Sequence, residues 1–310
     1  MLARVLAIAL HTYREAVRAR VLLGVFVLAF ATCIYSLFVA NLSLHNEARV
    51  VADLGAASFS LYGAVIAVVL GSTSLHRELE HKTIFPILSR PIRREEYLVG
   101  KYLGALLTVA VFVALDAALV LLLLALESGQ APWKLGAGAA AAFGLLALGL
   151  RRARGARVYV AIPWSLVALA GAWLVAAPAF DERQLVIASA ALAVSEMAII
   201  AAVTTLFSSF SSPFLTAVLT TMLFAIGRSA DGLARLPPKV VGAPVAAAGR
   251  TIARVVPNLH AYVPPRSLLL GEVAAAPVWP YVGAAAFHAA LYATALLAAG
   301  ALAFARRDFA

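Results

Sequence analysis

Three ionisable residues within apolar stretches are the side chains of this sequence most suited to chemistry. Glu196, Asp116 and His288 each stand inside a different long run of apolar residues. An ionisable group at membrane depth is costly, and by default it marks a substrate pathway or a coupling relay. The alternative for Glu196 is a protonated carboxyl that is hydrogen-bonded to a Ser or Thr of a neighbouring helix, because no basic residue within a span is placed to pair with it.

The motifs of several common enzyme classes are missing from the sequence. No GxxxxGK[ST] phosphate loop occurs, so the chain does not hold a nucleotide in the usual cradle of backbone amides. No HExxH occurs either, and His76 and His81 would stand about 140° apart around a helix, too far to share a metal ion. The stretch GSTS at 71–74 is not a GxSxG elbow, and no Asp/His pair is placed to activate its serines.

The longest charged passage, residues 76–101, reads HRELEHKTIFPILSRPIRREEYLVGK and separates two apolar runs. Thr83 is a suitable N-cap for a short helix, and Pro86 falls in the first turn, where its missing N–H costs little. Pro91 then biases Arg90 out of the α region and ends this helix. The short helix would carry a compact apolar face made of Ile84, Ile87 and Leu88.

A second helix is expected after the break, continuing into the next apolar run. Glu95 and Glu96 stand in its first turn, where the helix dipole favours acidic side chains. The passage therefore predicts a short helix held by stiff turns between two spans, an arrangement that transmits force well. The alternative on physical grounds is an ordinary interfacial helix that lies on lipid headgroups.

Composition places these residues in an integral membrane protein. Of 310 residues, 63% are hydrophobic and 13% are charged, whereas soluble domains are about 45–50% apolar and about 25% charged. The net charge of +10 comes from short clusters of Lys and Arg between the apolar runs, which indicates juxtamembrane charge and no nucleic-acid partner. Cys33 is the only cysteine, so disulfides within the chain and cysteine-rich metal sites are excluded.

Eight apolar runs approach the roughly 20 residues that a bilayer core requires. They predict an all-α integral membrane protein, a polytopic helical bundle of six core spans plus a probable two-span insertion at 135–178. The run 135–150 is short and rich in glycine, so the insertion is alternatively a re-entrant hairpin. No composition break suggests a soluble domain, and 1–310 is expected to form a single transmembrane domain. The expected spans are 21–41, 57–75, 101–126, 135–150, 158–178, 185–207, 213–228 and 280–305.

Basic residues predict the orientation of these spans. Sixteen of the 25 Lys and Arg residues fall on one side if both termini are cytoplasmic. Residues 1–20 are expected to form an amphipathic helix along the surface, with an apolar residue about every four positions at Val5, Ala9, Tyr13 and Val17.

The outer segment 228–279 is the exception to this charge distribution, since it holds six basic residues. Long translocated segments obey the rule poorly. Arg250 and Arg254 lie one helical turn apart beside Ile252, which indicates a basic amphipathic helix on the outer surface.

The passage ELEHKTIFPILSRPIRREEYLVGKYLGALL at 78–107 resembles the signature of the ABC type-2 permease family, the membrane subunits of ATP-binding-cassette exporters. The resemblance covers most of the chain except 128–184, and it departs from the family pattern at His81 and Lys82, where a glycine usually precedes the Thr. Four further pieces agree with it in order: the Arg-rich N-terminal helix, LFSSFSSPFLTAVLTTMLF (206–224), VPNLHAYVPPRSLLLG (256–271) and FARRDF (304–309).

The resemblance implies a multi-pass protein of the cell membrane with a cytoplasmic coupling segment at 76–94. This segment would dock into a groove on a separate phosphate-loop ATPase, which binds the ATP and Mg, so the chain needs no cofactor and performs no catalysis. A second permease subunit, identical or related, would complete the transporter within the lipid bilayer. The residues assigned to ATPase coupling are Glu78, Glu80, Lys82, Thr83, Ile84, Pro86, Ile87, Leu88, Arg90, Pro91, Arg93 and Arg94.

Two other classes of protein compete with this interpretation. A secondary transporter would need no ATPase, and it would show inverted repeats with broken helices at the midplane. The sequence shows no such repeat. A membrane enzyme or a scaffold would need a convergent polar site or a docking domain, and the sequence offers neither clearly.

Overall fold

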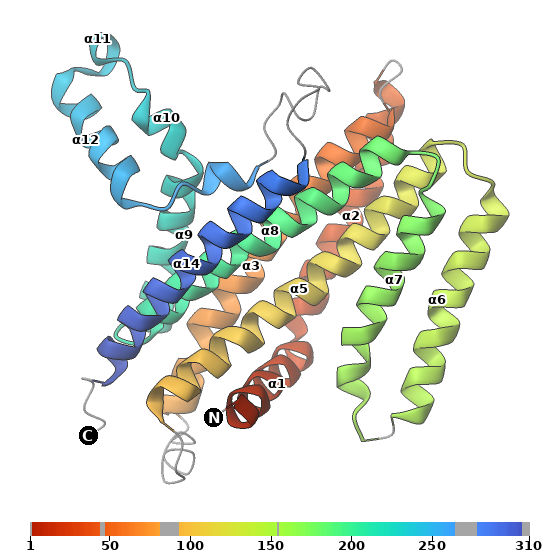
Figure 1. Ribbon diagram of the computed structural model, residues 1–310, viewed down its shortest axis with the longest axis horizontal. Coiled ribbons are helices and arrows are strands. Elements are labelled where there is room, and N and C mark those ends of the chain that lie inside the picture. The colour runs from red at the N-terminus through yellow and green to blue at the C-terminus, as the bar shows by residue number, and fades with distance from the viewer. Residues whose placement is uncertain (1, 44–46, 81–92, 154, 264–277, 306–310) are drawn as a thin grey trace.

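A computed structural model describes most of the chain, namely residues 2–43, 47–80, 93–153, 155–263 and 278–305. Every regular element in these ranges is a helix, as Figure 1 shows. In the labels of Figure 1 they are α1 (Leu2–Arg18), α2 (Arg20–Leu42), α3 (Glu47–Glu80), α5 (Arg94–Glu127), α6 (Pro132–Arg152), the 3₁₀ helix η1 (Arg157–Val160), α7 (Ala161–Val175), α8 (Phe180–Ser208), α9 (Pro213–Arg228), α10 (Ala230–Ala234), α11 (Pro238–Val241), α12 (Ala243–Val255), the 3₁₀ helix η2 (Leu259–Tyr262) and α14 (Val278–Ala305).

Seven helices of the described chain are long and apolar enough to cross a membrane, which confirms a multi-pass helical membrane protein. They are α2, α3, α5, α6, η1 with α7, α8 and α14. Each of the eight expected runs has a helix, but α9, with 16 residues, falls short of the length of the others. The span expected at 57–75 begins earlier, at Glu47, because α3 continues through charged residues that a hydropathy window excludes.

The helices alternate in direction, so their ends gather at two opposite ends of the bundle (Figure 1). The start of α1, the end of α3, the start of α5 and the end of α14 lie at the lower end in the view, and α10 to α12 lie at the upper end. The start of α1 and the end of α14 therefore lie at the same end of the bundle.

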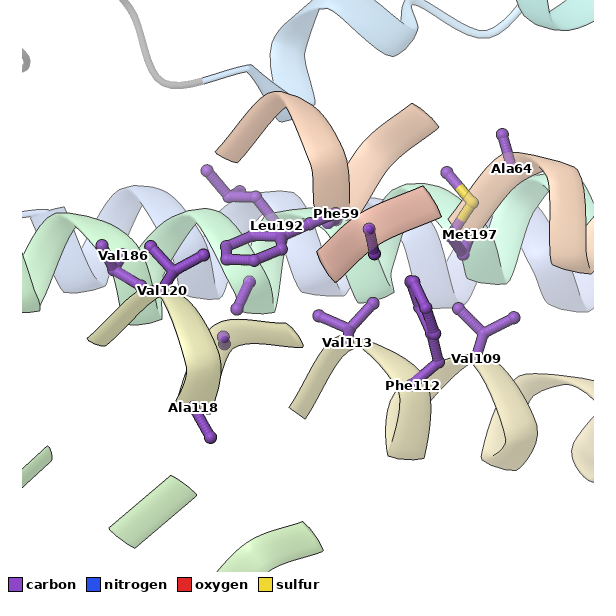
Figure 2. Close-up of a cluster of buried hydrophobic side chains, with 14 of the residues drawn as sticks. Phe59, Ala64, Val109, Phe112, Val113, Ala118, Val120, Val186, Leu192 and Met197 are labelled. Atoms are coloured by element: carbon purple, nitrogen blue, oxygen red, sulfur yellow. The ribbon is translucent and has the colours of Figure 1, made fainter. Parts of the chain in front are cut away.

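The core of the bundle is formed by α3, α5 and α8, whose buried side chains meet in Figure 2. Phe59 of α3 lies beside Leu192 of α8, and Phe112 of α5 lies on the side of Met197 of α8. Glycines on α3 allow a close approach to α8, since a Cβ atom at Gly71 would lie 2.5 Å from the Cγ2 of Thr204. Small residues at such contacts are typical of membrane helices, where backbone proximity replaces a hydrophobic driving force.

The helices α6 and α7 form a hairpin at the periphery of the bundle (Figure 1). α7 packs on α5, whereas α6 packs mainly on α7 and has no buried residue. The indole N–H of Trp164 donates to the carbonyl oxygen of Ala142 at 2.9 Å and joins the two helices. α6 has 21 residues, about 31 Å at 1.5 Å per residue, and η1 with α7 has 19, so both are candidate spans by length and composition.

The segment after α9 folds into a small helical unit in which α12 packs on α10 and α11. Gly249 of α12 lies so close to α10 that a Cβ atom there would be 2.8 Å from the carbonyl oxygen of Leu233. Arg250, Arg254 and Ile252 are all exposed. A helix with the basic and apolar pattern expected for 228–279 is therefore present, and its buried face consists of Ala246 and Gly249.

Candidate functional site

The first turn of α5 directly follows the segment expected to couple to an ATPase. Glu95 and Glu96 occupy this turn, as the helix dipole predicts. The carboxylate of Glu96 accepts from the backbone N–H of Arg93 at 3.4 Å, which caps one of the otherwise unpaired N–H groups at the helix start. Helix α5 therefore has a well-defined start at Arg94.

This turn also connects α5 to both terminal helices of the chain. The Nη1 atom of Arg4, in α1, lies 3.8 Å from the Oε2 atom of Glu96. The Nη1 atom of Arg94 donates to the carbonyl oxygen of Phe304, in α14, at 3.4 Å, and the rings of Tyr97 and Phe304 stack with centroids 6.5 Å apart. The first turn of α5 is therefore in contact with both α1 and α14.

Helix α1 packs directly against α5, and its buried face includes Ala9 and Tyr13 of the expected apolar stripe. Val17, expected on the same stripe, is exposed, because the buried face of α1 includes Thr12 and Ala16 and not Val17. Burial raises the pKa of the Tyr13 phenol to about 12. The expected surface helix is thus a helix docked on one span.

Two glycines make this docking possible. Gly100 and Gly104 stand one turn apart on α5, and a Cβ atom at Gly104 would lie 2.6 Å from the carbonyl oxygen of Ala9. Beside this close contact, the Nζ atom of Lys101 lies 3.4 Å from the Oε2 atom of Glu15, although Lys101 is a buried lysine. An intimate backbone contact and an ion pair therefore hold α1 against α5.

The expected coupling residues are only partly within the described chain. Glu78 and Glu80 belong to the end of α3, and Arg93 and Arg94 stand at the start of α5. Of these, Arg94 makes the bond to α14 described above. The other expected coupling residues lie outside the described residues, namely Lys82, Thr83, Ile84, Pro86, Ile87, Leu88, Arg90 and Pro91.

A buried ion pair forms the second notable site, between α8 and α9. Glu196 is fully buried, and the Nε atom of Arg228 lies 2.9 Å from its Oε1 atom. The Nη2 atom of Arg228 donates to the Oε2 atom of Glu196 at 3.1 Å, and the hydroxyl of Ser60, in α3, donates to the same oxygen at 2.8 Å. The expected hydrogen bond to a serine of a neighbouring helix is present, but the expected absence of a basic partner is wrong.

The length of α9 explains this correction. Its 16 residues extend about 24 Å, less than the roughly 30 Å of a bilayer core. Arg228 is the last residue of α9, and its side chain pairs there with Glu196 of α8. The sequence signal for this partner is a short apolar run that ends in an arginine, and it is a weak signal because an arginine at the end of a span is common.

A cavity of about 420 Å³ lies beside this ion pair. Ser60 and Arg228 form part of its wall, together with Asp53 of α3 and Ser189 of α8. Apolar side chains supply most of the remaining wall, and Tyr262 of η2 is part of it. The cavity thus combines an apolar interior with a few polar groups, which is the usual composition of a ligand site.

Asp116 and His288, the other two expected pathway residues, do not line this cavity. Asp116 is buried where α2, α3 and α5 meet, and it accepts from the Ser58 hydroxyl at 2.7 Å and from the Cys33 thiol at 3.7 Å. His288 is exposed on α14, and its Nδ1 atom is 2.9 Å from the hydroxyl of Tyr262. Asp116 thus joins three helices, whereas His288 supports a residue of the cavity wall.

Comparisons with known proteins find one family match. The model of a family described as "ABC-2 family transporter protein" matches residues 6–309, nearly the whole chain and including the stretch 128–184. No curated protein matches the sequence. No solved structure matches it either.

Proposed function

Because this chain belongs to the ABC-2 family of transporter proteins, we propose that it is an exporter subunit that moves its substrate with energy from a separate ATPase. The chain is an ABC transporter permease with several membrane-spanning helices. In this proposal the ATPase binds ATP and Mg at the cytoplasmic end of the bundle, and two permease subunits form the pathway in the cell membrane.

The observation that carries the proposal is the position of the start of α5. It follows residues 76–94, the proposed docking segment, and it lies at the same end of the bundle as the start of α1 and the end of α14 (Figure 1). Its first turn contacts both helices through Glu96 and Arg94. A push from an ATPase on this segment would therefore move three helices together, which is the kind of rigid-body motion that alternates access.

We propose that the charged residues of this segment determine which ATPase binds, since charges at an interface mainly set register and partner choice. Arg93 is suited to this role because it directly precedes α5. Arg94 has a second role within the chain, since it bonds to the carbonyl oxygen of Phe304. Separate variants of the two arginines can distinguish docking from internal coupling.

The experiment is purification of the tagged chain from its native membranes, followed by identification of a copurifying phosphate-loop ATPase and measurement of its activity. Arg93→Glu is expected to lower the amount of bound ATPase. Arg94→Glu is expected to leave more ATPase bound than Arg93→Glu does. It should nevertheless reduce the stimulation of the ATPase activity by the permease. Arg157→Glu is the matched control, because Arg157 is exposed at the start of η1, outside the docking segment.

An ATPase that stays bound and coupled in the Arg93→Glu/Arg94→Glu double variant would show that residues 76–94 are not the docking segment. Absence of any copurifying ATPase, with transport intact in vesicles that lack one, would instead support a secondary transporter.

A further inference from the structure

We propose that the cavity beside Glu196 and Arg228 binds an amphipathic organic cation, a molecule with one positive charge on an apolar body. The proposal rests on the permease function above, and it names the class of substrate that the permease takes. It depends on the size, the walls and the charge of the cavity.

The size and the walls suit an apolar body. The volume of about 420 Å³ falls within the roughly 300–1,000 Å³ of typical ligand sites. Ala57 and Leu61 of α3, Ala193 of α8 and Phe224 of α9 contribute apolar surface from three helices. A molecule enclosed by these helices would contact elements that move relative to one another if the bundle changes conformation.

The charge of the lining favours a cation. The charges of Glu196 and Arg228 compensate each other at 2.9 Å. The remaining charge on the lining is the carboxylate of Asp53, which is exposed and makes no hydrogen bond or ion pair with a described residue. The cavity therefore has at its edge a carboxylate that forms no ion pair with a described residue, and it has apolar surface within.

An aromatic ring adds to this preference, since the face of an aromatic ring attracts a cation. Tyr262 lines the cavity, and its hydroxyl is held by His288 Nδ1 at 2.9 Å, which fixes the ring. The Phe224 ring already has the guanidinium carbon of Arg228 at 5.7 Å from its centroid. Tyr262 is the other aromatic ring of the lining, and the His288 ring lies next to it with centroids 6.4 Å apart.

Arg49 competes with a bound cation, and it provides an internal test. It lies one helical turn before Asp53, and its charge acts on that carboxylate. It does not line the cavity. Removal of the Arg49 charge should therefore strengthen the binding of a cation, whereas removal of the Asp53 charge should weaken it.

The experiment uses two ions of matched size and shape, tetraphenylphosphonium and tetraphenylborate. The purified chain is placed in nanodiscs of phosphatidylcholine, and binding to empty nanodiscs is subtracted. The wild type is expected to bind the phosphonium at least about tenfold more tightly than the borate. Asp53→Asn should weaken phosphonium binding about tenfold, which corresponds to about 1.4 kcal/mol, and Arg49→Gln should strengthen it.

Two further variants separate the cavity from general effects of charge and folding. Ala57→Trp fills the cavity and should abolish specific binding of both ions. Asp181→Asn removes an exposed carboxylate from the first turn of α8, outside the cavity lining, and should leave both affinities unchanged.

Equal specific binding of the two ions would overturn the proposal, as would unchanged phosphonium binding in Asp53→Asn or weakened binding in Arg49→Gln. These measurements need no ATPase, so their failure is distinct from failure of the permease function. If the chain stimulates an ATPase but does not prefer the phosphonium, the permease function is supported and the cation site is refuted. If the chain prefers the phosphonium but never associates with an ATPase, the cation site is supported and the ATPase-coupled function is refuted.

Discussion

Replacement of Arg228 by methionine tests the buried ion pair most directly. Methionine keeps much of the length of the side chain but removes the charge and every donor. Glu196 would then be a fully buried carboxylate whose described partner is the Ser60 hydroxyl at 2.8 Å. The substitution therefore leaves a buried charge without a counter-ion, which is a strongly destabilising change.

The magnitude follows from burial. Removal of one partner of a buried pair costs about 3–5 kcal/mol. The side chain of Arg228 is 25% exposed whereas that of Glu196 is 0% exposed, so partial access of water places the expected loss at the lower end, about 3 kcal/mol. With an unfolding entropy of about 2.1 cal/mol/K per residue over 310 residues, this loss lowers the midpoint of unfolding by about 5 °C.

The assay is thermal unfolding of the detergent-solubilised chain, followed by the fraction that remains monodisperse after heating. Arg235→Met is the matched control, because Arg235 is exposed at the C-terminal end of α10, and surface changes are usually within about 0.5 kcal/mol. Glu196→Gln combined with Arg228→Met should recover most of the lost stability, because the buried charge is then absent.

An Arg228→Met chain as stable as the wild type would refute the reasoning, since it would show that Glu196 does not depend on Arg228. A double variant less stable than Arg228→Met would refute it too. That result would mean that the carboxylate itself, and not its pairing, supports the fold.

Three further outcomes test other parts of the structure. Gly104→Leu should detach α1 from α5 and expose the N-terminal region to limited proteolysis, whereas Gly136→Leu, with open space around its Cα, should not; equal proteolysis of the two variants would contradict the docking. Cys33 is 3% exposed, so a maleimide should label it only after unfolding, and rapid labelling of the folded chain would contradict its burial. Ser58→Ala removes the 2.7 Å hydrogen bond to Asp116 and should lower the free energy of unfolding by about 1–3 kcal/mol. The measurement is a fall in the midpoint of thermal unfolding, and an unchanged midpoint would show that Asp116 is satisfied without this bond.

The spans could be predicted from the sequence because the bilayer imposes a length and an apolar composition on each helix. The start of α3 could not be predicted in the same way. Glu47, Arg49 and Asp53 resemble loop residues in a hydropathy window, but each lies within the helix. A helix that continues beyond the hydrocarbon core carries no apolar signal over that part of its length.

The candidate site was only half predictable. Glu196 stands out in sequence because a carboxylate within an apolar run is unusual. Arg228 does not stand out, because an arginine at the end of a span is common, and its pairing depends on where α9 ends relative to α8. The packing of α1 against Gly100 and Gly104 is likewise a contact between segments that are distant in the sequence. It could therefore be identified only from the three-dimensional structure.

The short length of α9 has a consequence for the membrane around the protein. A helix of 16 residues is about 6 Å shorter than a typical hydrocarbon core, so lipid next to it must thin or the helix must be drawn inward. The charge of Arg228, at the C-terminal end of this helix, would resist the second response in a thick bilayer. If α9 crosses the bilayer, the pairing of Arg228 with Glu196 would respond to the acyl chain length of the surrounding lipid.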